Sequence, residues 1–92
     1  MANDPKVRKS VTLSECAPVA GGWRAAGHAT NAGSTSIAYA VTVFFTTASA
    51  TTLNYAETTV NVAPGKTASW SVNKEFTGPK SIRCVLRGVS AK

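Results

Sequence analysis

The sequence predicts an all-β domain, an antiparallel β-sandwich of six or seven short strands. Three observations lead to this fold class. No apolar period of 3.6 residues persists through the chain, β-branched residues are abundant, and turn signals recur every eight to twelve residues. The 92 residues suffice for one domain, and neither a repeat nor a linker divides them. We expect a disordered N-terminal arm over residues 1–6 and a single β-sandwich over residues 7–92.

The most strongly patterned stretch is residues 35–47, TSIAYAVTVFFTT. Apolar side chains recur there at every second position and predict a central, half-buried strand; they are Ile37, Tyr39, Val41, Val43 and Phe45. Phe44 breaks the alternation because it points to the otherwise small and polar face. Either that face is covered at this point, or Phe44 is an exposed anchor for a partner.

The segments before the central strand predict a hairpin. A first strand is expected from Val7 toward Cys16, broken by Pro18 and the glycine pair Gly21-Gly22. A second strand over residues 23–30 has small residues that allow a neighbouring sheet to approach, and the segment 31–34 then forms a turn.

Three more strands are expected after the central one. Residues 53–62 have no clean apolar face and indicate an edge strand, with a bulge where the apolar phase shifts toward Val60. Pro64 and Gly65 predict a type II turn, and the next strand, 67–73, should turn Trp70 inward. Residues 74–80 form a loop. The last strand, 81–90, is expected to place Ile82, Cys84 and Leu86 on one face and Arg83, Val85, Arg87 and Val89 on the other.

Cys16 and Cys84 lie near the two ends of the patterned region. A bridge between them would close a loop of 68 residues (84 − 16) and remove on the order of 4 kcal/mol from the unfolded state on the chain-entropy account. The alternative is a pair of buried free thiols, which behave as small hydrophobic groups. We expect the disulfide, which implies an oxidising compartment.

Neither a membrane span nor a signal peptide is recognisable in the sequence, because no apolar run is long enough. This pattern fits a mature domain that is secreted or belongs to the cell envelope. It also fits a virion protein that never had a signal. The net charge of +6, from ten basic and four acidic residues, favours binding to an anionic partner such as a cell-surface polymer, or to a protein.

No motif predicts catalysis, a metal site or a cofactor. His28 is the only histidine, and the cysteines lack metal-ligand partners at a familiar spacing. The segment Gly65-Lys66-Thr67 resembles the end of a phosphate-binding loop, but a strand pattern follows it where that motif needs a helix. We therefore expect a protein that is not an enzyme. Specific nucleic-acid binding is not expected either, since basic and aromatic residues do not alternate on adjacent strands.

The candidate binding surface consists of four basic and two aromatic residues: Arg24, Lys80, Arg83, Arg87, Trp23 and Phe44. Arg83 and Arg87 should share a strand face about 13 Å apart, from the ~3.3 Å rise per residue. The alternative for these charges is a solvated face that discourages aggregation. Trp23 is either a core residue or, with Tyr55, a flat platform that stacks on a sugar ring.

Several of these features together resemble the FxLYD-like group, small immunoglobulin-like sandwich domains of actinobacterial secreted proteins and lipoproteins. They are the turn from Gly27 to Asn31 before the strand YAVTVFF, the Pro64-Gly65 turn, the following Trp70 and the paired cysteines. The loop ASATT departs from the Asp-x-x-Gly turn often found after the central strand in that group. The resemblance implies an immunoglobulin-like fold and a non-catalytic extracellular module.

The function expected from the sequence is thus a non-enzymatic extracellular binding or structural module whose ligand is unknown. One alternative is a phage virion surface or decoration protein, for which the cysteines should be reduced. The other is a carbohydrate-binding module, which requires at least two coplanar exposed aromatic rings.

Overall fold

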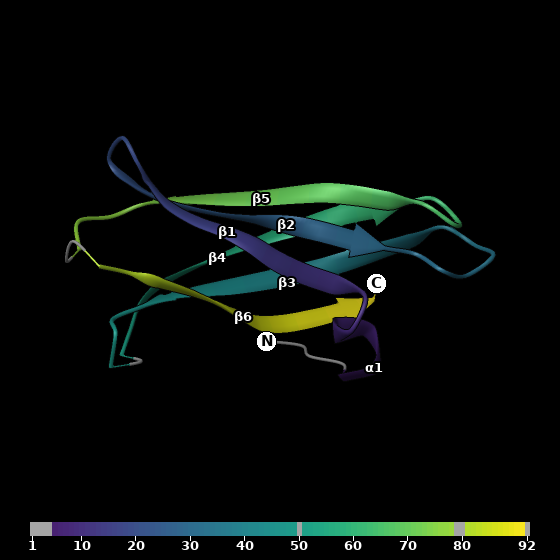
Figure 1. The fold of residues 1–92 in the computed structure, drawn as a ribbon, viewed down its shortest axis with the longest axis horizontal. Coiled ribbons are helices and arrows are strands. Elements are labelled where there is room, and N and C mark those ends of the chain that lie inside the picture. The colour runs from purple at the N-terminus through teal and green to yellow at the C-terminus, as the bar shows by residue number, and fades with distance from the viewer. Residues whose placement is uncertain (1–4, 50, 79–80, 92) are drawn as a thin grey trace.

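The computed structural model describes residues 5–49, 51–78 and 81–91, and it confirms the predicted fold class. Six strands form an immunoglobulin-like sandwich of two three-stranded antiparallel sheets, whose strand orders are β1-β2-β5 and β4-β3-β6 (Figure 1). The elements are α1 (Pro5–Arg8), β1 (Val11–Val19), β2 (Gly22–Thr30), β3 (Ile37–Thr46), β4 (Thr52–Val62), β5 (Thr67–Glu75) and β6 (Arg83–Ala91).

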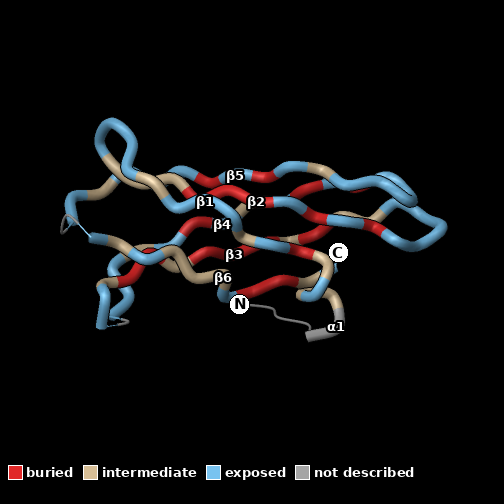
Figure 2. The backbone as a smooth tube through the Cα atoms, viewed as in Figure 1, coloured by how far each residue is buried: buried red, intermediate tan, exposed pale blue. Residues whose placement is uncertain are grey.

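The core lies between the two sheets and consists of the inward positions of each strand (Figure 2). The central strand β3 contributes its predicted alternating set, of which Val41, Val43 and Phe45 are fully buried. From the opposite sheet, Ala25 and Ala29 of β2 and Trp70 and Val72 of β5 pack against them. Small residues on β2 therefore leave room for the large ones on β3 and β5.

The N-terminal segment differs from the prediction. Pro5–Arg8 form a single helical turn, where the pattern had predicted a disordered arm up to residue 6 and a strand from Val7. The first strand begins only at Val11, and Met1–Asp4 lie outside the described residues. The helix packs beside β6, and the Arg8 guanidinium donates a hydrogen bond to the Leu86 carbonyl.

Strand β1 ends later than predicted, because Pro18 does not end it. The strand pairs with β2 as far as Val19 opposite Gly22. β1 pairs only with β2 and is therefore an edge strand, where proline is tolerated. The turn follows at Ala20-Gly21, and Gly21 has a φ of 78°, a conformation that favours glycine.

Strand β4 is an edge strand, as predicted, but its pattern differs from the expectation. Its even-numbered residues face the core: Ala56, Val60 and Val62 are buried. The irregularity lies at the start of the strand, where Leu53 has no partner on β3, and the pairing is regular near Val60. Tyr55, on the other face, is 52% exposed.

The predicted faces of the last strand hold as far as Leu86, but a β-bulge at Arg87 makes them wrong beyond it. Val43 pairs with Leu86 and Thr42 with Gly88, so Arg87 is the extra residue. Beyond the bulge the alternation is shifted by one position. Val89 consequently faces the core and is fully buried, although strict alternation had placed it on the outer face with Arg83 and Val85.

The predicted type II turn is confirmed between β4 and β5. The Lys66 amide donates to the Ala63 carbonyl over 3.1 Å, and Gly65 has a φ of 72°. Asn31, which directly follows β2, links this turn to the loop between β2 and β3. Its buried side-chain amide donates to the carbonyls of Thr35 and Val62, and its side-chain oxygen accepts from the Gly33 amide.

The predicted disulfide joins Cys16 on β1 to Cys84 on β6, with the two Cα atoms 5.7 Å apart. The chain itself connects β4 to β5 through the short turn at the other side of the sandwich. The bridge thus joins the edge strands β1 and β6 of the two sheets, which are the first and last strands of the chain and are not joined by a turn. Within the described residues, no helix is long and apolar enough to cross a membrane.

Candidate binding surfaces

The structure divides the six predicted surface residues between different parts of the molecule. Phe44, Arg83 and Arg87 lie on the outer face of the β4-β3-β6 sheet. The register between β3 and β6, which pairs Phe44 with Val85 and Thr46 with Arg83, brings these three residues close together. Arg24 lies on the opposite sheet, where it forms an ion pair with Glu15. The single basic patch that would have included all four cations is therefore not formed by the described residues.

Trp23 and Lys80 are the remaining two predicted residues. Trp23 is half-buried and packs against the core, so it does not form a platform with Tyr55, which lies on the other sheet. Lys80 lies outside the described residues.

An aromatic–arginine face, defined here as Phe44, Tyr55, Val85 and Arg87, occupies the middle of the outer surface of the β4-β3-β6 sheet. Phe44 pairs across strands with Tyr55 on one side and Val85 on the other. The rings of Phe44 and Tyr55 have centroids 6.2 Å apart and planes tilted by 52°. The Arg87 guanidinium carbon lies 6.0 Å from the Phe44 centroid, at the outer limit of a cation–π contact.

Shallow hollows lie on both sides of Phe44. One, of about 110 Å³, is lined by Phe44, Thr46, Thr52, Val85 and Arg87. The other, of about 220 Å³, is lined by Thr42, Phe44, Tyr55 and Glu57. Phe44 thus separates two hollows of different charge: one is lined by the positively charged Arg87 and the other by the negatively charged Glu57.

The bulge at Arg87 and the cross-strand pairing together create this arrangement. The bulge leaves Arg87 without a partner residue on β3, and its side chain reaches back over Phe44. Tyr55 comes from the edge strand β4 and is among the most exposed large apolar residues described. The arrangement presents apolar surface and a cation to solvent, which is the composition of protein interaction sites.

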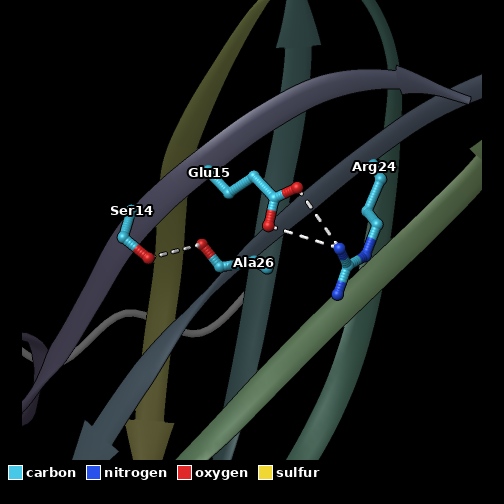
Figure 3. Close-up of polar contacts among 4 residues, drawn as sticks. All are labelled: Ser14, Glu15, Arg24 and Ala26. Carbon is cyan, nitrogen blue, oxygen red and sulfur yellow. Dashed lines mark hydrogen bonds and ion pairs between the residues drawn. The ribbon is translucent and has the colours of Figure 1, made fainter.

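A third hollow, of about 260 Å³, lies on the outer face of the β1-β2-β5 sheet. Its lining includes Ser14, Glu15, Arg24 and Ala26, all shown in Figure 3, together with Gly27, His28, Ser69, Trp70 and Ser71. Nη1 of Arg24 donates to both carboxylate oxygens of Glu15, over 3.3 and 3.2 Å. The Ser14 hydroxyl donates to the Ala26 carbonyl over 3.4 Å. We call this region the polar hollow.

The floor of the polar hollow depends on small residues and on a second bulge. Leu13 pairs with Gly27 and Glu15 with Ala26, so Ser14 is the extra residue on β1. At this point the backbone of β1 lies unusually close to that of its neighbour β2: a Cβ atom added to Gly27 would lie 1.8 Å from the Thr12 carbonyl oxygen. Glycine is therefore required for this approach, and the bulge directs the Ser14 and Glu15 side chains to the rim.

Sequence patterns indicated part of these two sites. Phe44 was singled out because it broke the alternation, whereas Tyr55 was considered only as a partner of Trp23. The polar hollow was not anticipated, because Glu15, His28, Ser69 and Ser71 come together only through strand register. A polar residue alternating with small ones on each of two strands, as in RAAGHAT and TASWSV, is the available signal.

In the part of the chain that the structure describes, no three His, Cys, Asp or Glu side chains lie close enough to hold a metal ion. Comparisons of the chain with protein-family models, with curated proteins and with solved structures find no match.

Proposed function

We propose that this chain is a non-enzymatic extracellular binding module that recognises a protein partner through the aromatic–arginine face. The observation that carries the proposal is the cluster of Arg87, Phe44 and Tyr55 on a sheet whose other face already forms the core. Arg87 and Tyr55 are exposed, and the Phe44 ring between them is half-buried. Tyrosine and arginine are enriched among the residues that dominate binding energy at protein interfaces. The kinship with FxLYD-like domains remains a prediction, and it is consistent with such a role.

The charges on this surface favour a protein over an anionic polymer. Arg83 and Arg87 carry positive charge at the β6 side, whereas Glu57 carries negative charge at the β4 side. A uniformly anionic chain crossing this face would meet the Glu57 carboxylate. A protein surface can present an acidic group to the arginines, an apolar group to Phe44 and a basic group to Glu57.

The Cys16–Cys84 bridge supports the extracellular part of the proposal, because disulfides persist in oxidising compartments. It counts against the virion alternative, which predicts reduced cysteines. A carbohydrate-binding module that stacks sugars on a flat platform is also less favoured. Trp23 packs against the core, and the ring planes of Phe44 and Tyr55 are 52° apart.

Site-specific photo-crosslinking tests the proposal. Tyr55 is replaced by p-benzoylphenylalanine, and the intact domain is irradiated with the envelope and secreted fractions of the organism that produces it. The same replacement at Asn73, an exposed residue on β5 of the other sheet, is the matched control. We expect a discrete protein adduct from position 55 that is absent from position 73.

Substitutions on the face show whether the adduct depends on it. Phe44→Ser and Arg87→Ser, each introduced beside the crosslinker, should abolish the adduct, while circular dichroism confirms that the variants are folded. Equal adducts from positions 55 and 73 would refute the assignment of the face. A protease-resistant, heterogeneous adduct would show that the partner is a polymer and refute a protein partner.

A further inference from the structure

We infer that the polar hollow is a second binding site, for one unit of a neutral polyhydroxylated ligand such as a sugar ring. The polar hollow lies on the opposite sheet from the aromatic–arginine face, so this inference is independent of the function proposed above. It rests on the size of the hollow, on its charge balance and on the kind of hydrogen-bonding groups around its rim.

The size of the hollow limits the ligand to a small one. At about 260 Å³ and open to solvent, it is below the range of roughly 300–1,000 Å³ for clefts that enclose a drug-sized molecule. The floor, formed by Ala26 and Gly27, is nearly buried and contributes no side chain beyond a methyl group. One six-membered ring can lie on this floor while its substituents reach the rim.

The charges on the rim cancel, which favours an uncharged ligand. Glu15 and Arg24 are paired with each other at 3.2 Å, and their side chains are 47% and 39% exposed. An anion would have to displace Glu15 from Arg24, and a cation would have to displace Arg24 from Glu15. A neutral ligand can bind with the ion pair intact.

The rim offers acceptors and donors side by side, as a diol requires. Each hydroxyl of a diol donates one hydrogen bond and accepts others, so it needs both kinds of group nearby. The Glu15 carboxylate has lone pairs beyond those that meet Arg24 Nη1, and the Arg24 guanidinium has N–H groups beyond that nitrogen. Ser69 and Ser71 are both exposed and add hydroxyls on the far side of the floor.

Strand register holds these groups at a fixed spacing. Ala26 pairs with Glu15 on β1 and with Ser71 on β5, and His28 pairs with Ser69. The Glu15 and Ser71 side chains therefore flank the same floor residue from opposite sides. Preorganised groups on strands lose little freedom on binding. The Trp70 ring in the lining is buried and packs in the core, so it offers no open face for stacking, and we expect only millimolar affinity.

The test is a titration of the ¹⁵N-labelled domain followed by NMR. The probes are the methyl α-glycosides of glucose, mannose and galactose, together with myo-inositol, and inorganic phosphate and acetate serve as charged probes. We expect at least one neutral probe to shift the amides of Ala26, His28 and Ser71, while the amides of Phe44 and Tyr55 stay in place.

Matched glutamate variants test the assigned role of the carboxylate. Glu15→Gln should weaken binding of that probe about tenfold, because it removes a charged acceptor. Glu57→Gln, an equally conservative change at an exposed residue of the other sheet, should leave it unchanged. Ser71→Ala should weaken it less than Glu15→Gln, without disturbing the ion pair.

Three results would overturn the inference. The first is no localised shift with any neutral probe, and the second is stronger binding of phosphate or acetate than of the neutral probes. The third is equal affinity in wild type and Glu15→Gln. Since the aromatic–arginine face is monitored in the same spectra, shifts confined to it would refute the polar hollow without bearing on the protein partner.

Discussion

Removal of the disulfide should be the most damaging change outside the core. With Cys16 and Cys84 both replaced by alanine, the unfolded chain regains the freedom of a loop with a sequence separation of 68. The chain-entropy relation gives about 4 kcal/mol at 25 °C for a loop of this length. A 92-residue domain is expected to have a total stability of roughly 5–14 kcal/mol, so the loss is more than a quarter of it.

The native state should contribute little to this loss. Cys16 is exposed and Cys84 is half-buried, so the sulfur atoms remove little surface from water. The effect should therefore lie mainly in the unfolded state, which becomes more extended. We expect the double variant to unfold at lower guanidinium concentration and with a larger m-value than the wild type.

The assay is equilibrium unfolding in guanidinium chloride, followed by the fluorescence of the two tryptophans, Trp23 and the buried Trp70. Wild type that has been reduced and alkylated should give the same stability as the double variant, which controls for the substitutions themselves. A loss below about 1 kcal/mol would refute the reasoning. It would mean that packing between β1 and β6 alone keeps this side of the sandwich closed.

Three further changes test the details of the fold by the same unfolding assay. Gly27→Ala should lower the free energy of unfolding by about 2 kcal/mol or more, because the new Cβ atom clashes with the Thr12 carbonyl oxygen and β1 must move. An unchanged free energy of unfolding would show that β1 is not held at that distance from β2. Val89→Ala should cost about 2 kcal/mol and Val85→Ala less than about 1 kcal/mol, and the reverse order would contradict the bulge at Arg87. Asn31→Ala should cost about 3 kcal/mol, because two carbonyls and one amide lose their partner, and a loss under about 1 kcal/mol would mean that water replaces it.

The parts of the fold that could be predicted are those in which the alternation of apolar residues is uninterrupted. The inward sets of β3 and β5 follow from a strict period of two, and the positive φ of Gly65 follows from the Pro-Gly turn chemistry. The disulfide followed from the positions of the two cysteines near the ends of the patterned region.

The parts that could not be predicted depend on contacts with other strands. A bulge such as the one at Arg87 is defined by the register with β3. Its local sign in the sequence is Gly88, since a glycine inside a strand often marks a bulge, but the glycine does not fix which residue is extra. Similarly, Pro18 was predicted to end β1 because an edge position cannot be recognised from the strand's own sequence. The four-residue helix α1 is too short to show a helical period.

The binding surfaces were partly predictable for the same reason. Phe44 stood out within its own strand, but its neighbours Tyr55 and Arg87 come from two other strands and reach it through register and bulge. Of the two alternatives for Trp23, the structure favours the core position, because Trp23 packs against the core and lies on a different sheet from Tyr55. A surface built across strands requires the pairing, which single-strand patterns do not contain.

The outer face of the β4-β3-β6 sheet carries more apolar surface than the fold requires. The core is complete without Phe44, Tyr55 and Val85, which all point away from it. Neighbouring outward positions such as Thr42 and Thr59 carry threonine, which has an equally high strand propensity and costs nothing in solubility. An exposed apolar cluster on a sheet with an open edge is an aggregation hazard, which natural proteins usually blunt with charge. Here the charge is present as Arg87, stacked on the same ring, so the cluster is both kept soluble and kept accessible. The core does not include these residues, and this is the physical reason for proposing that a partner binds this face.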